Sequence, residues 1–136
     1  MLNKVLCIED NKIMQKIYKR MINKINFADK IIIIENGKKA IEYYMDMQKS
    51  STTDRSEHPD LIFLDLNMPV MGGWEFLDEI EKLNKDESLL PPIVILTSSV
   101  DPREKERAND YSKILEFVSK PLTFEILEDL EKKLKS

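Results

Sequence analysis

Polar residues follow short apolar runs at four places in the chain, and their side chains suit metal and phosphoryl chemistry. They are Glu9 and Asp10, Asp65 and Asn67, Thr97 with Ser98 and Ser99, and Lys120 before Pro121. A carboxylate such as Asp65 can accept a phosphoryl group as an acyl phosphate. Grouped carboxylates repel one another, and a hard cation such as Mg²⁺ relieves that repulsion. Because a lysine and a hydroxyl can neutralise phosphoryl oxygens, the four clusters together predict a metal-dependent phosphoryl site.

The elements that must bring these clusters together alternate between strands and helices. Apolar runs at 5–8, 31–34, 61–64, 93–96 and, more weakly, 114–118 are continuous, which is typical of parallel strands covered on both faces. Helical spacing of apolar residues follows at 14–21, 40–45, 76–83 and 127–134, and a polar, exposed helix is expected over 102–111. The alternation predicts a doubly wound α/β domain, without giving its strand order. The clusters should then meet at the carboxyl edge of the sheet, where ligands bind.

Length and composition limit the other possibilities. With 136 residues, we expect a single domain over 1–136, without an output domain and with a polar loop insertion at about 48–58. The net charge of −4 disfavours nucleic-acid binding through a general basic field. One cysteine and one histidine exclude a disulfide scaffold and a Cys/His zinc site. Apolar runs of four residues and no signal peptide predict a cytoplasmic protein that does not enter a membrane.

Each polar residue also has a purely structural interpretation. Asp10 could cap a helix that begins near residue 11, and Asp65 could start a turn before the following proline. Thr97 could be an ordinary β-branched strand residue, and Lys120 an exposed lysine before a proline turn. The coincidence of all four at corresponding strand ends favours a functional site over four separate structural roles.

The order and spacing of these residues resemble the receiver domain of two-component response regulators, and the single-domain chemotaxis receiver in particular. The resemblance rests on the acid pair at 9–10, the run Asp65-Leu-Asn-Met-Pro-Val-Met-Gly-Gly, Thr97-Ser98 and Lys120-Pro121. It covers essentially the whole chain. It implies the flavodoxin-like receiver fold, a five-stranded parallel sheet in the order 2-1-3-4-5 with five helices. Gly72 departs from the family, which commonly has Asp at that position.

The resemblance also implies residue roles. Asp65 matches the phosphorylated aspartate, and Glu9 and Asp10 match the pair that holds Mg²⁺, with Asp10 the better match to a direct ligand. Asn67 matches the position whose backbone carbonyl binds the metal, so that the implied ligand set is Glu9, Asp10, Asp65 and Asn67. The phosphate-binding and switch positions match Thr97, Ser98, Lys120 and Phe117, and Pro121 matches the family's cis-proline.

The function that the resemblance implies is a signalling phosphoacceptor, which catalyses only its own phosphorylation and dephosphorylation. Its partners would be a histidine kinase or histidine phosphotransfer protein and a downstream protein that reads the face made by the fourth helix, fifth strand and fifth helix. A phosphorelay intermediate, a phosphate sink and a pseudo-receiver are alternatives. A haloacid-dehalogenase-type phosphatase fits less well, because its aspartyl nucleophile follows the first strand. A flavin site fits poorly because Glu9 and Asp10 would repel the flavin phosphate.

Overall fold

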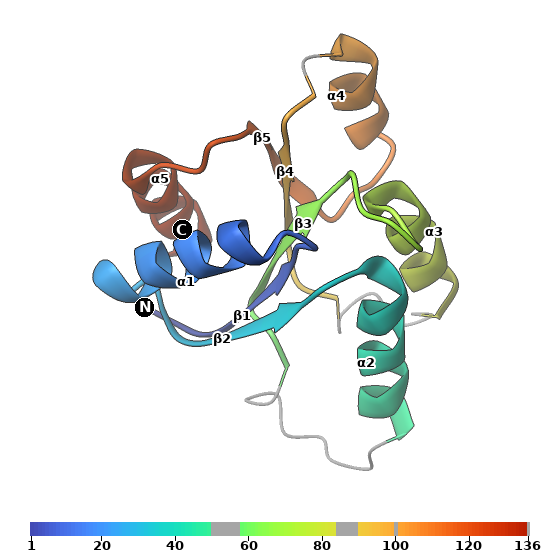
Figure 1. The fold of residues 1–136 in the computed structure, drawn as a ribbon, viewed down its shortest axis with the longest axis horizontal. Coiled ribbons are helices and arrows are strands. Elements are labelled where there is room, and N and C mark those ends of the chain that lie inside the picture. Colours follow the sequence, from blue (N-terminus) through green and yellow to red (C-terminus); the bar gives the residue numbers. More distant parts are fainter. Residues whose placement is uncertain (50–57, 84–89, 100, 136) are drawn as a thin grey trace.

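Strands and helices alternate strictly along the chain in the computed structural model, which describes residues 1–49, 58–83, 90–99 and 101–135 (Figure 1). In order, the elements are β1 (Leu2–Ile8), α1 (Lys12–Lys24), β2 (Ala28–Ile34), α2 (Gly37–Lys49), β3 (Leu61–Asp65), α3 (Gly73–Leu83), β4 (Ile93–Thr97), α4 (Pro102–Ala108), β5 (Ile114–Ser119) and α5 (Phe124–Lys135). The predicted alternation is confirmed. Among the described residues, no helix is both long enough and apolar enough to cross a lipid bilayer.

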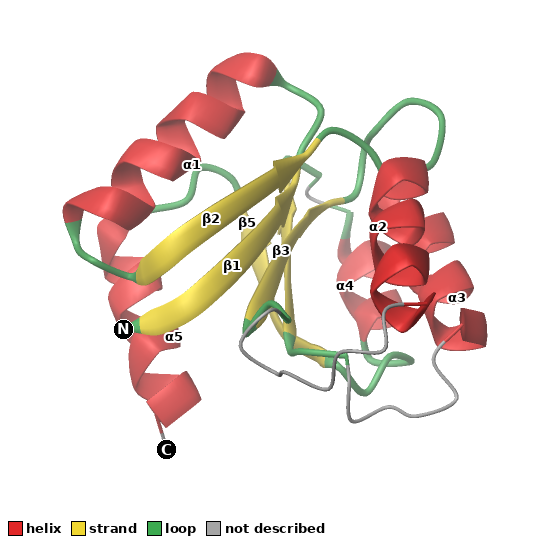
Figure 2. Ribbon diagram, turned by 90° about the horizontal axis from the view of Figure 1, so that it is seen from below, coloured by secondary structure: helices red, strands yellow, loops and turns green. Residues whose placement is uncertain are grey.

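The five strands form one parallel sheet in the order β2-β1-β3-β4-β5, as the resemblance implied. Helices α1 and α5 cover one face, and α2, α3 and α4 cover the other (Figure 2). Every residue of β3 and β4 is buried, whereas the outer strands are partly exposed. The continuous apolar runs therefore reflect burial on both faces of the sheet.

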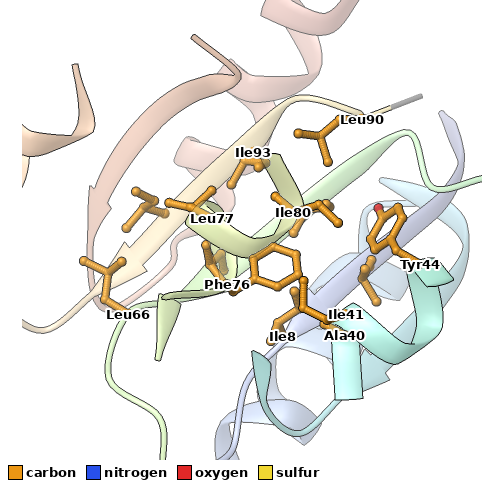
Figure 3. Packing of buried hydrophobic residues seen from close by; sticks show 14 of the residues in the cluster. Ile8, Ala40, Ile41, Tyr44, Leu66, Phe76, Leu77, Ile80, Leu90 and Ile93 are labelled. Atoms are coloured by element: carbon orange, nitrogen blue, oxygen red, sulfur yellow. The ribbon is translucent and has the colours of Figure 1, made fainter. Parts of the chain in front are cut away.

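Two apolar cores lie on opposite faces of the sheet. Within β1, Leu6 and Ile8 point into the core under α2 and α3, while Val5 and Cys7 point into the core under α1 and α5, because successive strand residues face opposite sides. The first core includes Phe76, which packs among the residues shown in Figure 3. Both cores together hold the strand ends in fixed positions at the carboxyl edge.

The structure differs from the sequence-based expectation at several element boundaries. Strands β1 and β2 each begin three residues before their apolar runs, where the register pairs Leu2 with Ala28 and Lys4 with Lys30. Asp60 accepts hydrogen bonds from the Asn3 and Lys4 amides there. Helix α1 is capped by Asn11, whose Oδ1 accepts from the amides of residues 13 and 14, so Asp10 is not the cap. Helix α2 includes residues 48 and 49 of the expected 48–58 insertion, and residues 50–57 lie outside the described part.

The loop after β3 returns closely against the end of that strand. The Gly73 amide donates a hydrogen bond to the Leu66 carbonyl oxygen over 3.0 Å. A Cβ atom on Gly73 would lie 2.8 Å from the Asp65 carbonyl oxygen and 2.9 Å from the Leu66 Cα. Gly73 does not have a positive φ, so close approach explains the glycine, rather than backbone freedom. The start of α3 is therefore fixed against the backbone of Asp65.

Replacing Gly73 with alanine should destabilise the fold. The added methyl would press on backbone atoms that cannot rotate away, so Gly73→Ala is expected to lower the free energy of unfolding by about 1–3 kcal/mol in urea denaturation. Gly72→Ala is the matched control, because its Cβ would lie no closer than 3.1 Å to another heavy atom, the Leu66 carbonyl oxygen, and its cost should be smaller. Equal stability of Gly73→Ala and the wild type would contradict this close approach.

Candidate functional site

Three carboxylates converge at the carboxyl edge of the sheet. Glu9 and Asp10 directly follow β1, and Asp65 is the last residue of β3, which neighbours β1 in the sheet. The register pairs Ile8 with Leu64, which places Glu9 beside Asp65. Carboxylate oxygens of the three residues lie within 4.8 Å of one another. Glu9 and Asp65 are only 1% and 5% exposed, and Asp10 is more exposed.

A single lysine connects the two buried carboxylates. Lys120 Nζ lies 3.0 Å from Glu9 Oε1 and 3.4 Å from Asp65 Oδ1. Lys120 directly follows β5, and its amide donates a hydrogen bond to the Thr97 carbonyl oxygen over 2.7 Å. The peptide bond from Lys120 to Pro121 is cis. The lysine therefore reaches the acidic cluster from the other side of β4.

Backbone amides complete the contacts of the buried acids. The Asn67 amide donates to Asp65 Oδ1 over 3.2 Å, and the Asn11 amide donates to Glu9 Oε2 over 3.1 Å. The side-chain amide of Gln15 donates to the Glu9 carbonyl oxygen over 2.6 Å. Sequence reasoning did not identify Gln15, because a single glutamine in an amphipathic helix carries no motif. Its place in the first turn after the acid pair is the only signal that could have indicated it.

The charges in this pocket do not balance. The pKa of Asp65 is raised to about 7, first by burial and then by the neighbouring Glu9 carboxylate, while Lys120 acts to lower it. Burial lowers the pKa of the Lys120 ammonium, but hydrogen bonds and attraction from Glu9 and Asp65 outweigh burial and raise it. Lys120 therefore stays charged, and three carboxyl groups share this one ammonium. Such a pocket can accept a divalent cation with oxygen ligands.

The hydroxyl side of the site lies at the end of β4. Thr97 is fully buried, and its Oγ1 accepts a hydrogen bond from the Ser99 amide over 3.1 Å. Ser99 Oγ in turn accepts from the Asp101 amide over 3.2 Å, and Asp101 caps α4. Ser98, between them, is exposed. The Thr97 hydroxyl is thus part of the turn that leads into α4.

Phe117 lies apart from this polar cluster, on the outer strand β5. It is partly buried and packs against the core under α2 and α3. The structure therefore brings Glu9, Asp10, Asp65 and Lys120 together, places Asn67 and Thr97 at the same edge, and leaves Phe117 on the neighbouring surface.

This arrangement agrees with the comparison to known protein families. The family model described as the response regulator receiver domain matches residues 5–132. The chain belongs to this family. Receiver domains are signalling proteins that act with histidine kinases or phosphotransfer proteins, and this receiver carries an acidic pocket built from Glu9, Asp10 and Asp65. Membership argues against the dehalogenase-type and flavin alternatives.

Similar proteins include both short regulators and long kinases. The receiver is 32% identical over 94 residues to the response regulator Rcp1 of Synechocystis, covering 69% of this chain and 61% of Rcp1. It is 29% identical over 127 residues to hybrid signal transduction histidine kinase I of Dictyostelium discoideum, covering 93% of this chain and only 7% of that kinase. It is also 29% identical over 132 residues to the probable methanogenesis regulatory protein FilR2 of Methanothrix harundinacea, covering 96% of this chain and 80% of that protein.

Solved structures share the fold across the whole receiver. A two-component response regulator from Cytophaga hutchinsonii is 27% identical, with a TM-score of 0.85 and coverage of 98% of this chain and 97% of that one. The receiver domain of a sensor histidine kinase from Pseudomonas aeruginosa, described with a magnesium ion coordinated in its active-site cleft, is 18% identical with a TM-score of 0.75, and each chain is covered completely. At that identity the likeness shows the fold alone.

The raised pKa of Asp65 predicts an unusual stability effect in the presence of a chelator. The pKa rises from its usual 3.8 to about 7 in the folded protein, so the folded state holds this proton more tightly than the unfolded state does. Stability from this group is therefore present below pH 4 and is lost as the pH rises to 7. Asp65→Asn should raise the free energy of unfolding at pH 8 on the order of 2–4 kcal/mol, and by less at pH 5.

Urea denaturation at the two pH values measures this effect. Asp46→Asn makes the same chemical change on the exposed surface of α2 and serves as the matched control. We expect little difference between the control and the wild type at either pH. An Asp65→Asn protein no more stable than the wild type at pH 8 would contradict the proposed repulsion.

Proposed function

We propose that this receiver is a phosphoacceptor, in which Asp65 accepts a phosphoryl group with the help of Mg²⁺. The observation that carries the proposal is the bridge from Lys120 Nζ to Glu9 Oε1 and Asp65 Oδ1, at 3.0 and 3.4 Å, within a cluster of three carboxylates. A structural ion pair would need one carboxylate, whereas this pocket holds an excess of negative charge. This excess of carboxyl groups over cations supports a cation site.

The donor atoms in the pocket fit Mg²⁺, which takes carboxylate and carbonyl oxygens and keeps several waters. We assign Glu9, Asp10 and Asp65, with the backbone carbonyl of Asn67, to hold the ion. Both oxygens of Glu9 already accept hydrogen bonds, from Lys120 and from the Asn11 amide, which supports contact with the ion through water. When bound, the ion would neutralise phosphoryl oxygens and draw the donor phosphate towards Asp65.

The chemistry required of the protein itself is nucleophilic attack and charge neutralisation. A carboxylate oxygen of Asp65 forms the new bond to phosphorus, and the bond from phosphorus to the donor nitrogen or oxygen breaks as the donor leaves with its electron pair. Lys120 would then pair with the phosphoryl group, and the Thr97 hydroxyl would donate to it. Attack of water on the acyl phosphate would reverse the modification. Donors would be a histidine kinase, a histidine phosphotransfer protein or a small acyl phosphate.

The proposed output surface is the face formed by α4, β5 and α5, next to Thr97 and Lys120. A groove of about 510 Å³ lies between β5 and α5 and is lined in part by Phe117, Ser119 and Ile126. Phe117 is partly buried, so a change in its rotamer would alter this groove. A groove with apolar and charged walls supports a protein partner, and the net charge of −4 supports the same choice over nucleic acid.

Phosphorylation of Asp65 is tested directly with acetyl phosphate and Mg²⁺. The mass of the intact wild-type protein should increase by one phosphoryl group, and Asp65→Asn should show no increase because the amide is not a nucleophile. Asp46→Asn, the exposed control on α2, should be labelled as fully as the wild type. Equal labelling of wild type and Asp65→Asn would overturn the assignment of the acceptor.

Binding of a partner in the groove between β5 and α5 is tested by placing a bulky side chain there. Ser119 is exposed on β5, and Ser119→Trp should reduce capture of a downstream partner by the receiver phosphorylated with acetyl phosphate and Mg²⁺ at least about tenfold in a pull-down, because the bulky ring enters the groove. Lys38→Trp, an exposed substitution on α2 at the opposite edge of the sheet, is the matched control. Capture that ignores Ser119→Trp would place the output surface elsewhere. The absence of any phosphorylation-dependent partner would favour a relay or a phosphate sink.

A further inference from the structure

Helix α4 is tied to α3 by a cluster of four side chains, Trp74, Asp78, Arg107 and Tyr111, here called the Trp74 cluster. The Trp74 and Tyr111 rings stack with their centroids 5.7 Å apart and an interplanar angle of 27°. The Arg107 guanidinium lies 4.6 Å from the centre of the Trp74 ring, and the Tyr111 hydroxyl donates to Asp78 Oδ1 over 2.6 Å. The cluster thus combines stacking, a cation–π contact and a charge-assisted hydrogen bond.

Within the described part of the chain, few other contacts hold α4 in place. Of its seven residues, only Ala108 is buried. Tyr111 lies just beyond the helix, and its amide donates to the Ala108 carbonyl oxygen over 3.2 Å, so the ring moves with the end of α4. An element with so little buried apolar surface depends on its side-chain contacts for its position. The Trp74 cluster is therefore a substantial part of what positions α4.

Both ends of α4 are connected to the acidic pocket. At the first end, hydrogen bonds lead from the Thr97 hydroxyl through Ser99 to Asp101, which caps the helix. At the other end, Arg107 contacts Trp74, which follows Gly73, the residue packed against the Asp65 carbonyl. A shift of Thr97 towards a phosphoryl group would pull on the first end, while the cluster holds the second end to α3.

We propose that the Trp74 cluster restrains α4 in the unphosphorylated arrangement and so opposes phosphorylation of Asp65. The inference rests on the proposed function, and it names a regulation of the same site. If phosphorylation and the intact cluster favour different positions of α4, the two are linked, and weakening the cluster strengthens binding of a phosphoryl group by at most the same factor. Arg107 and Tyr111 would then act as positioning residues that set how readily the pocket accepts a phosphoryl group.

Beryllium trifluoride with Mg²⁺, which mimics a phosphoryl group on an aspartate, provides the test. Arg107→Gln removes the cation from the ring, and Tyr111→Phe removes the hydrogen bond to Asp78 but keeps the stacked ring. A cation–π contact at an exposed site corresponds to a factor of about two to five in an equilibrium constant. We expect Arg107→Gln to bind the analogue about two- to fivefold more tightly than the wild type, and Tyr111→Phe to change in the same direction.

Titration of beryllium in excess fluoride and Mg²⁺ gives these affinities, with the fluorescence of Trp74, the chain's only tryptophan, as the signal. Lys105→Gln is the matched control, because it removes one positive charge from the exposed surface of α4 while the stacking, cation–π and hydrogen-bond contacts of the cluster do not involve Lys105, and it should bind as the wild type does. The affinity for Mg²⁺ alone should be equal in all four proteins. General damage to the fold would weaken binding, so tighter binding distinguishes a restraint from a structural role.

Each other outcome is informative. Equal or weaker analogue binding by Arg107→Gln and Tyr111→Phe, relative to Lys105→Gln, would overturn the restraint while leaving the proposed function intact. A wild-type protein that does not bind the analogue at all would overturn the proposed function, and the restraint with it.

Discussion

The burial of two carboxylates beside a single ammonium is the constraint on which this structure depends. Glu9 and Asp65 are almost inaccessible to solvent, and Lys120 serves both. Burying an ionised carboxylate without full compensation is unfavourable, and the raised pKa of Asp65 expresses that cost. The rest of the molecule has to supply enough stability to keep these groups together. A pocket in which carboxyl groups repel one another is suited to a cation.

The two cores supply that stability and also set the geometry. Parallel pairing of β1 with β3 places Glu9 beside Asp65, and pairing of β3, β4 and β5 brings Lys120 within reach of both. The strands are parallel and therefore all end at the same edge of the sheet. The polar side chains at this edge lie beyond the apolar cores and do not interrupt their packing. Backbone amides at Asn11 and Asn67 complete the hydrogen bonding where side chains do not. The apolar interior and the polar edge are thus separate parts of one sheet.

Helix α4 contrasts with this rigid frame. Its exposed surface and single buried residue leave its position to polar and aromatic side-chain contacts, each of modest strength. Little buried apolar surface therefore opposes a change in its position, whereas both cores hold the sheet. The hydrogen bonds from Thr97 to Asp101 give it a direct connection to the pocket. If Asp65 is phosphorylated as proposed, a stable sheet and a weakly held helix would provide the two parts that a switch requires.

The sequence by itself determined the layered α/β fold. Strands that are buried on both faces need apolar residues at successive positions, and such runs alternate with helical patterns along the chain. It also indicated Glu9, Asp10, Asp65, Thr97 and Lys120, since polar residues at corresponding strand ends can meet only at one edge of a parallel sheet. The strand order came from the family resemblance, because the alternation of elements is the same for other orders.

Only the tertiary structure decided which polar atoms pair with which. Three pairings are of this kind: Lys120 bridges Glu9 as well as Asp65, Asn11 rather than Asp10 caps α1, and Gln15 donates to Glu9. Each depends on how far apart the donor and acceptor atoms lie once the chain has folded. The Trp74 cluster joins α3 to the end of α4 across more than thirty positions, between Asp78 and Tyr111. Polar and aromatic residues on the surface show no regular spacing in the sequence. Their partners are therefore decided only when the folded sheet and its helices bring them together.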